Sequence, residues 1–324
     1  MDRGSRQSGN PEQLPTRAAT ESLRVGFIGA GKAGTSFGKY IAVRAAEQNR
    51  AEVSLSGYFS LNRDSATSAA ALTGSAAFTS GVHLAEASDI IFFSVPDGKI
   101  EPAFHALIRE GRDARVDLSG KTFAHLSGSL SSEIFDGPDL PARSAFSLHP
   151  VCALPDRGES WGLLREACFV FEGADEARER ITPLLGVLGN PVGTITPDRK
   201  TLYHAACVFL SNFSVGLAAQ GTGLLALCGL EPEISSKFLQ TLFLGNAENV
   251  ARLGPAEALT GPAERGDADT IREHMDALSG LGDESLTDVY RGLTKVLLRI
   301  AGERHPGRDY SDAHAAIGSD SGSA

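Results

Sequence analysis

The segment Gly29-Ala30-Gly31-Lys32-Ala33-Gly34 restricts the fold of this chain more than any other part of its sequence. It follows an apolar run at 23–28 that is typical of a buried strand, and a helix-compatible stretch at 35–46 comes after it. In such a unit the first glycine permits a tight turn, the second admits a pyrophosphate, and the third lets the helix pack closely on the sheet. The free N–H groups at the helix start also bind phosphate. The segment therefore predicts a dinucleotide-binding turn, with a bare glycine turn as the alternative.

Strand and helix patterns alternate from residue 23 to about 196, and only helix patterns follow. Short apolar or β-branched runs predict strands at 23–28, 53–59, 90–95, 122–125, 144–148, 168–172 and 192–195. Helices are predicted at 198–229, 232–253, 267–278 and 284–301. This order predicts an α/β fold, in which an N-terminal Rossmann doubly wound parallel sheet is followed by an all-α C-terminal domain. The expected parts are a disordered extension at 1–22, a dinucleotide-binding domain at 23–196, a helical domain at 197–302 and a disordered tail at 303–324.

The helical part contains a long uncharged stretch, Ala205–Leu230. It is long enough to cross a hydrocarbon layer, but it contains several polar residues and four glycines, and no second such stretch accompanies it. We therefore predict a buried helix in the centre of the helical domain. A domain of about 105 residues is too small to cover such a helix completely. Exposed apolar surface and a homodimer are the consequence that we expect.

Charge and motif content exclude several classes of function. With 30 Lys and Arg against 40 Asp and Glu, the net charge of -10 disfavours binding to nucleic acid and to anionic membranes. The four cysteines are too far apart for a metal or redox pair and are typical of a reducing cytoplasm, and no metal site is expected. The N-terminal extension lacks an apolar signal region, and the common hydrolase, zinc-protease and P-loop motifs do not occur. We expect a cytoplasmic protein with a small-molecule partner.

The end of the second predicted strand indicates which dinucleotide is bound. NAD-binding domains usually place an Asp or Glu there, on the ribose hydroxyls. Here the strand ends without a carboxylate, and Ser60, Asn62 and Arg63 follow, which can donate hydrogen bonds to a 2′-phosphate. NADP is therefore predicted. NAD is the alternative, because Asp64 contacts the ribose if the strand extends further than the pattern indicates.

Further motifs occur at strand ends and along the helical part. They are Val95-Pro96-Asp97, His125-Leu-Ser127-Gly128, Ser147-Leu-His149-Pro150, Tyr203-His204-Ala-Ala and Gly261-Pro-Ala-Glu-Arg265-Gly-Asp267. Over about Leu23–Ala301 the chain resembles the Rossmann-like proteins with a DUF2520 domain, in the superfamily of 6-phosphogluconate dehydrogenase, pyrroline-5-carboxylate reductase and ketopantoate reductase. The resemblance implies an NADP-dependent oxidoreductase, commonly dimeric, whose second domain is like the C-terminal domain of 6-phosphogluconate dehydrogenase. It implies no particular substrate.

Three of these motifs follow predicted strands, and the carboxyl ends of strands are where sheets of this type bind ligands. Val95, Pro96 and Asp97 are expected to border the cofactor. The Ser127 hydroxyl is expected to anchor the nicotinamide carboxamide, unless it only caps the following turn. His149 is a candidate for proton transfer, because histidine titrates near neutral pH and the following proline holds its backbone extended. A buried histidine bonded to a loop carbonyl is the alternative.

The start of the helical part carries Lys200, Tyr203 and His204 at a spacing that predicts one shared helix face. In the related hydroxyacid dehydrogenases a lysine at such a position is the general acid. The resemblance therefore gives this role to Lys200 and makes Tyr203 and His204 the accompanying polar pair. A solvated lysine and a tyrosine that only packs are the alternatives.

Polar residues further along are candidate substrate contacts. Ser211 and Asn212 interrupt an apolar helix, and Arg265 can hold a carboxylate, with helix packing and a structural loop as alternatives. Together these features predict an NADP-dependent reductase of a small carbonyl or imine, with a 2-oxo acid of the ketopantoate type as one candidate by analogy. The proton donor is left open among Lys200, His204 and His149. A non-catalytic NADP-binding or ligand-sensing protein that retains the fold is the competing interpretation.

Overall fold

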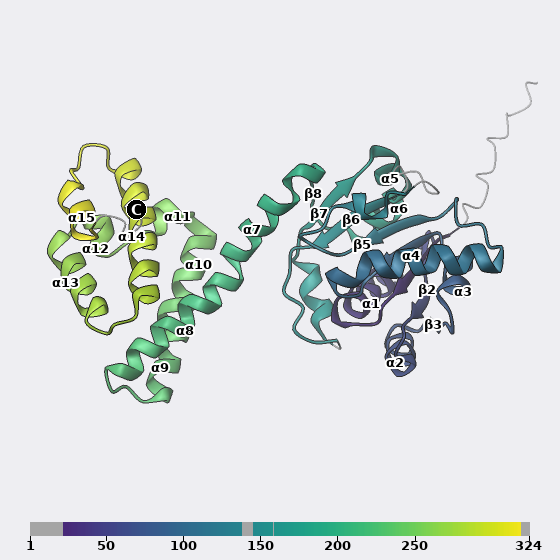
Figure 1. The fold of residues 1–324 in the computed structure, drawn as a ribbon, viewed down its shortest axis with the longest axis horizontal. Helices are drawn as coiled ribbons and strands as arrows, with labels where there is room; N and C mark the ends of the chain where they lie inside the picture. The colour runs from purple at the N-terminus through teal and green to yellow at the C-terminus, as the bar shows by residue number, and fades with distance from the viewer. Residues whose placement is uncertain (1–21, 138–144, 158, 319–324) are drawn as a thin grey trace, which may run out of the picture. The chain divides into compact units, whose positions relative to one another are not determined.

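The computed structural model describes residues 22–137, 145–157 and 159–318. They divide into two compact units, of which the first ends at Ser211 and the second begins at Asn212 (Figure 1). The division lies later in the chain than the predicted boundary at 197, because Lys200 and Tyr203 are hydrogen-bonded to residues of the sheet unit. The predicted N-terminal extension lies outside the described residues up to position 21.

The first unit is built on an eight-stranded sheet with the order β3-β2-β1-β4-β5-β6-β7-β8. Its strands are β1 (Leu23–Ile28), β2 (Val53–Phe59), β3 (Ala76–Ala77), β4 (Ile90–Phe93), β5 (Thr122–His125), β6 (Ala145–Pro150), β7 (Phe169–Gly173) and β8 (Val192–Thr194). All neighbouring pairs are parallel except β6 and β7, which are antiparallel. The predicted Rossmann fold is confirmed, although the sheet is not parallel throughout and β3 is too short to give a sequence pattern. The order reverses between β1 and β4, which opens a crevice at their carboxyl ends.

Helices cover both faces of this sheet (Figure 1). They are α1 (Lys32–Glu47), α2 (Arg63–Thr73), α3 (Gly81–Glu86), α4 (Asp97–Ala114), α5 (Asp175–Arg180) and α6 (Thr182–Leu188), with the short turns η1 (Ser132–Phe135) and η3 (Ser160–Arg165). The turn η4 (Pro197–Arg199) and α7 (Lys200–Leu210) follow β8, and α7 runs away from the sheet. Successive residues of β4 point to opposite faces, so Phe92 joins the core under α1, α2 and α6 while Phe93 joins the core under α3 and α4. This double coverage explains why β4 is apolar without interruption.

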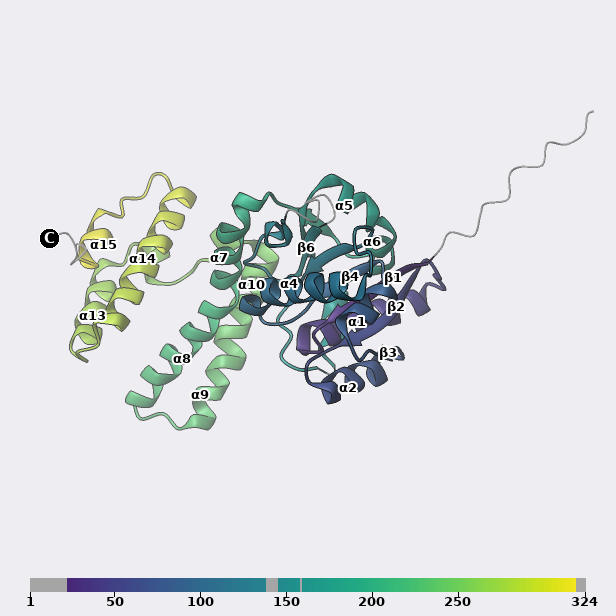
Figure 2. The ribbon, with the colours of Figure 1, turned by 45° about the vertical axis from the view of Figure 1, so that its right-hand side comes forward.

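The second unit consists of helices only, as predicted. They are α8 (Asn212–Leu227), α9 (Pro232–Phe238), the π-helical turn η5 (Leu239–Phe243), α10 (Leu244–Leu253), α11 (Pro255–Ala258), α12 (Pro262–Arg265), α13 (Ala268–Ser279), α14 (Glu284–Arg304) and α15 (Ser311–Ala316). Figure 2 shows α13, α14 and α15 side by side around the small core of this unit. The segment 311–316 differs from the predicted disordered tail, because Ala313 and Ile317, one helical turn apart, are buried in that core.

The long apolar stretch also differs from its prediction. It is broken at Ser211 between α7 and α8, and no residue of α8 is buried within the described chain. Val215, for example, is 71% exposed. The expected buried central helix is therefore wrong for a single copy, because the described elements of the helical unit leave every residue of α8 at least partly exposed. Of the described helices, only Pro197–Leu227 is long and apolar enough to span a membrane, which is weak support for a membrane because soluble core helices share these properties.

Candidate cofactor and active site

The three glycines of the turn between β1 and α1 have different surroundings. Gly29 has a φ of +105°, and a side chain there would collide with the backbone of Ser94. A Cβ at Gly34 would lie 2.1 Å from the Ser94 Oγ. At Gly31, by contrast, the nearest protein atom would be 3.9 Å from a Cβ. Packing within the chain therefore explains Gly29 and Gly34, whereas Gly31 has an open side that leaves room for a phosphate.

The N-terminus of α1 offers an electrostatic environment suited to that phosphate. Gly31 occupies the N-cap position without a side-chain cap, and the first turn contains no acidic residue. Lys32 is exposed and adds a positive charge to the helix dipole. Ala30 is buried and Ala33 packs against the core, so their side chains support the turn and do not face a ligand.

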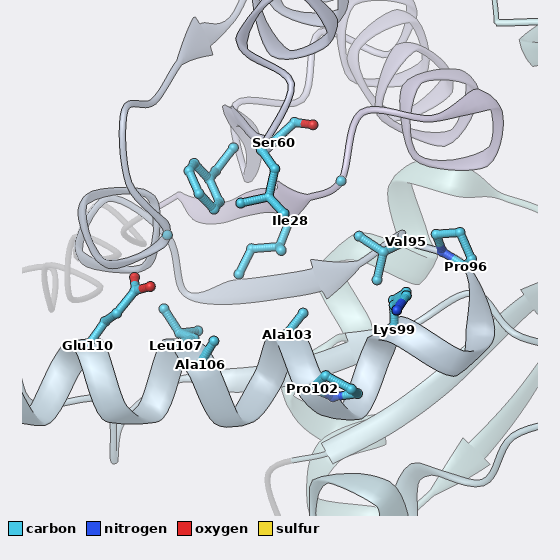
Figure 3. A pocket seen from close by; sticks show the side chains of 14 residues that line it. Ile28, Ser60, Val95, Pro96, Lys99, Pro102, Ala103, Ala106, Leu107 and Glu110 are labelled. Carbon is cyan, nitrogen blue, oxygen red and sulfur yellow. The ribbon is translucent and has the colours of Figure 1, made fainter.

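A cavity of about 470 Å³ opens beside the turn, at the carboxyl ends of β1, β2 and β4 (Figure 3). Its walls are mainly apolar and include Ile28, Val95, Pro96 and one face of α4. Figure 3 shows Lys99 and Glu110 at the two ends of that helix face and Ser60 on the opposite side. An apolar cavity with a few polar groups at its border is suited to a flat aromatic base with an attached ribose.

The second strand, whose end indicates the cofactor, ends where the sequence pattern predicts. Strand β2 ends at Phe59, so Ser60 follows it directly and lines the cavity. The Asn62 Oδ1 caps α2 by accepting a hydrogen bond of 3.1 Å from the Ser65 N–H. Arg63 and Asp64 are exposed in the first turn of α2, where a carboxylate is favoured by the helix dipole. The longer strand required by the NAD alternative is therefore absent from this described region.

Asp97 and Ser127, each expected to contact the cofactor, are bonded to each other. The Asp97 carboxylate accepts hydrogen bonds of 2.8 Å from the hydroxyls of Ser127 and Ser129. The Ser127 Oγ also accepts hydrogen bonds of 3.1 Å from the N–H groups of Ser129 and Leu130. Its only hydroxyl hydrogen is thus used within the protein. The capping role that was the alternative for Ser127 is the one seen here.

Lys200 lies inside the sheet unit and is only 2% exposed. Its Nζ donates hydrogen bonds to the Ser127 carbonyl oxygen at 3.0 Å and to the Ser147 Oγ at 2.8 Å. The third N–H of the ammonium has no acceptor among the described residues. Burial lowers the pKa of Lys200 to about 8, and the negative charge of Glu172 limits this decrease. The alternative of a solvated lysine is wrong, and the side chain is mostly protonated at neutral pH.

His149 and Tyr203 form a second polar pair next to Lys200. The His149 Nδ1 lies 2.6 Å from the Tyr203 hydroxyl. Burial, together with the charge of Lys200, lowers the pKa of His149 to about 4, while burial raises that of Tyr203. Both side chains are therefore neutral at pH 7.

The glycine of the His125-Leu-Ser127-Gly128 motif lies against both histidines. A Cβ on Gly128 would be 2.9 Å from the His149 Nε2 and 3.0 Å from the His204 Cδ2. Lys200, His149, Tyr203 and His204 are therefore gathered at one place in the sheet unit. His125 is fully buried nearby, and its ring nitrogens are bonded to the 127–131 turn.

The predicted substrate contacts are distributed differently. Ser211 follows the last residue of α7, and Asn212 begins α8 in the second unit. Arg265 is the last residue of α12 and forms an ion pair of 3.7 Å with Asp267, which caps α13. As substrate contacts, all three remain predictions. Among the described residues there is no cluster of His, Cys, Asp and Glu that could hold a metal ion.

Sequence reasoning missed two members of the site. The sequence pattern places Ser147 in a motif and Glu172 at the end of a predicted strand, and it assigns a role to neither side chain. Both are fully buried, and they are paired across β6 and β7. The available signal was a carboxylate inside the apolar sequence Phe-Val-Phe-Glu-Gly, because a buried charge requires partners.

The parallel strand order, the glycine turn after β1 and the all-helical second unit together define a Rossmann-type fold followed by a helical unit. Residues 167–296 match the family described as a domain of unknown function, DUF2520, which confirms the predicted resemblance. The match begins within the sheet unit and contains both Glu172 and Lys200. No protein of curated function matches the chain in sequence.

Solved structures with the same fold cover most of the chain. A protein of Thermotoga maritima is 25% identical, with a TM-score of 0.67 over 86% of this chain and 98% of its own. A Bacteroides fragilis protein, provisionally described as an NADP oxidoreductase, is 21% identical, with a TM-score of 0.62 over 87% of this chain and 100% of its own. The pyrroline carboxylate reductase of Plasmodium falciparum, solved with NADP bound, is 13% identical, with a TM-score of 0.53 over 87% and 100%. The chain thus shares the fold of nicotinamide-dependent reductases.

Proposed function

We propose that the protein is an NADP-dependent reductase of a small carbonyl or imine compound, with 2-oxo acids of the ketopantoate type as one candidate class. The observation that carries the proposal is a buried ammonium, Lys200, at the same edge of the sheet as the glycine turn. NADPH, when bound, supplies a hydride. Negative charge then develops on the substrate oxygen or nitrogen, and this charge requires a nearby cation or acid.

The residues present fit an NADP molecule. The open side of Gly31 and the N–H groups of α1 would hold the pyrophosphate, and the cavity along α4 would hold the adenosine. Ser60, the Asn62 amide N–H and Arg63 would contact the 2′-phosphate, as an arginine suits a phosphate better than a ribose hydroxyl. The reductase of P. falciparum with NADP bound supports this choice of cofactor at the level of the fold.

Among the three candidate proton donors, Lys200 is favoured by charge. With a pKa of about 8 it is protonated at neutral pH and can still release a proton to a developing alkoxide or amide anion. His149, with a pKa of about 4, is neutral and a poor acid at pH 7. If Tyr203 donates to its Nδ1, the Nε2–H is free to orient the substrate. His204 borders the same space.

The Lys200→Met variant tests this role. We expect turnover to fall by roughly 10²–10⁴, with NADPH affinity nearly unchanged, because a general acid is lost while the phosphate contacts remain. Wild-type turnover should also decrease as the pH rises above about 8, where Lys200 loses its proton. Single-turnover kinetics and fluorescence titration with NADPH measure the two quantities. A Lys200→Met enzyme with the wild-type rate, beside an inactive His149→Ala enzyme, would reverse the two roles.

The second candidate function, a non-catalytic NADP-binding protein, is favoured by one observation. Two of the three N–H groups of Lys200 are bonded to the protein itself, as in a purely structural lysine. Stereospecific exchange of deuterium from labelled NADPH into a panel of carbonyl and imine compounds distinguishes the two. NADPH binding without any exchange would favour the sensing protein.

We also propose that the protein is a cytoplasmic homodimer. Support for association comes from apolar residues on α8, η5 and α10 that are largely exposed within the described chain, such as Val215, Leu242 and Leu244. Burying such surface against a second copy is favourable by about 25 cal/mol per Å². The four cysteines are all unpaired, which is in keeping with a reducing compartment.

A further inference from the structure

Glu172 carries a carboxylate in the middle of the sheet, where it is fully buried. Register pairs it with Ser147 on β6, and Ser147 is paired with His125 on β5, so three polar residues form a row across the sheet. Among the described residues, no lysine or arginine donates a hydrogen bond directly to this carboxylate. A buried charge without a cation in contact is costly unless hydrogen bonds and a nearby countercharge compensate it.

The hydrogen bonds of Glu172 have a fixed direction. An ionised carboxylate only accepts, so the Ser147 hydroxyl must donate its single hydrogen to the Glu172 Oε2, at 3.1 Å. The Ser147 oxygen can then only accept a hydrogen bond from Lys200, at 2.8 Å. The Lys200 Nζ is therefore required to act as a donor at this position. The negative charge of Glu172, held close by this chain of bonds, favours the ammonium over the neutral amine.

The other side of the carboxylate is attached to the turn before η1. The Ser132 N–H and hydroxyl each donate a hydrogen bond of 2.8 Å, to Oε2 and Oε1 respectively. The Ser131 hydroxyl adds a longer bond of 3.3 Å to Oε1. Ser131 and Ser132 thus hold Glu172 in place, and neither is a hydrogen-bond partner of Lys200. They offer matched control positions, because their removal disturbs the same carboxylate from the opposite side.

We propose that Glu172 is a positioning residue, which through Ser147 fixes the Lys200 ammonium at the reaction site and keeps it protonated. The proposal rests on the proposed function, in which Lys200 is the proton donor. It adds that a carboxylate on β7, which does not touch substrate or cofactor, limits how far burial lowers the pKa of this acid.

Other titratable groups also face Lys200. Asp97 on α4 and Cys207 on α7 carry or can carry negative charge, and both raise its pKa after Glu172. His149 on β6 and His125 on β5 are neutral at pH 7, with pKa values of about 4. Asp97 binds the side chain of Ser127, whereas Lys200 binds only the backbone carbonyl of that residue. Among the described carboxylates that raise the pKa of Lys200, Glu172 is therefore the one that shares a hydroxyl group, that of Ser147, with the ammonium.

The pKa of Lys200 can be measured directly and without any substrate. The chain has only seven lysines. An NMR titration of the full-length protein with labelled lysine side chains should resolve the Lys200 signal, which is assigned by its loss in Lys200→Met. We expect the pKa to fall by about one unit or more in Glu172→Gln, since a compensating charge within a few ångströms shifts a pKa by roughly 1–3 units. The Ser132→Ala control should leave it within ~0.3 units of the wild type.

A second pair of variants covers the case in which Glu172→Gln does not fold. Ser147→Ala removes the linking hydroxyl and should also lower the pKa of Lys200, and Ser147→Thr, which restores a hydroxyl, should return it towards the wild-type value. An unchanged pKa in Ser147→Ala, or an equal change in Ser132→Ala, would overturn the proposal. If turnover is found, the decrease of the turnover rate at high pH should begin at a lower pH in the same variants. A protein that binds NADPH but never turns over, with the expected pKa changes intact, would refute the proposed function while leaving the positioning by Glu172 supported.

Discussion

The sheet unit and the helical unit differ in how they bury their apolar residues. The twelve largest fully buried side chains, all of them Phe or Tyr, belong to the sheet unit. In the helical unit, only the 259–317 region has a buried cluster, and neither α8 nor α10 contains a buried residue. The core of the sheet unit is thus formed within one chain, whereas the first half of the helical unit exposes apolar residues, which the proposed homodimer would cover. The two units should consequently respond differently to substitution and to protein concentration.

The largest effect is expected from a charge on the uncovered surface. Val215→Glu should raise the dissociation constant of the homodimer by at least about 1000-fold, because symmetry places two unpaired carboxylates in the buried interface. Light scattering at micromolar concentration measures this. Leu163→Glu, at an exposed apolar position of the sheet unit, is the control and should leave the dimer intact. A monomeric wild-type protein would remove the basis of the comparison.

A cavity in the sheet unit should destabilise the protein without any dependence on concentration. Phe92 is fully buried and contacts the rings of Phe27, Phe37 and Phe146 at centroid distances of 5.4 to 5.6 Å. Phe92→Ala should lower the free energy of unfolding of this unit by about 3–5 kcal/mol. Denaturant unfolding at two protein concentrations tests both statements. A midpoint that shifts with concentration as strongly as that of a helical-unit variant would contradict them.

The buried histidine of the polar row should make the stability of the sheet unit dependent on pH. Burial lowers the pKa of His125 to about 4, below the value of about 6.5 expected in the unfolded chain. The unfolded chain therefore binds the proton first, and stability is lost as the pH falls from about 6.5 to 4. The loss attributable to His125 is about 3 kcal/mol. His125→Gln should flatten this part of the stability profile, and an unchanged slope would assign the loss to other groups.

The smallest effect concerns the cofactor. Arg63→Met should cost roughly 1.5–3 kcal/mol of NADPH affinity, about ten-fold or more, with little effect on NADH, because the 2′-phosphate loses a charged partner. Isothermal titration with both cofactors measures the difference. Gly31→Asp is the control for the turn and should abolish binding of both, since a carboxylate would lie where the pyrophosphate belongs. Tighter binding of NADH than of NADPH by the wild-type protein would refute the cofactor assignment.

Local sequence determined much of the sheet unit. Strand β2 and strand β5 begin and end at the residues that their patterns predicted, because alternation and β-branched content act over a few neighbouring residues. The glycine turn was predictable for a similar reason, since the positive φ of Gly29 is a property of one residue. The shared face of Lys200 and Tyr203 follows from their helical spacing, whereas the place of His149 beside Tyr203 depends on how α7 meets the sheet.

Tertiary structure decided the features that depend on register and coverage. That Glu172 lies beside Ser147 follows from the antiparallel pairing of β6 and β7, which no local pattern in either strand specifies. Whether Lys200 is solvated or buried depended on the turn at Ser127, far away in the chain, which supplies the carbonyl that binds it. The exposure of α8 was also decided by tertiary structure, because periodicity reports that a face is apolar but not which surface covers it. Hydrophobic pattern and backbone preference are local, whereas hydrogen-bond partners and burial are properties of the assembled chain.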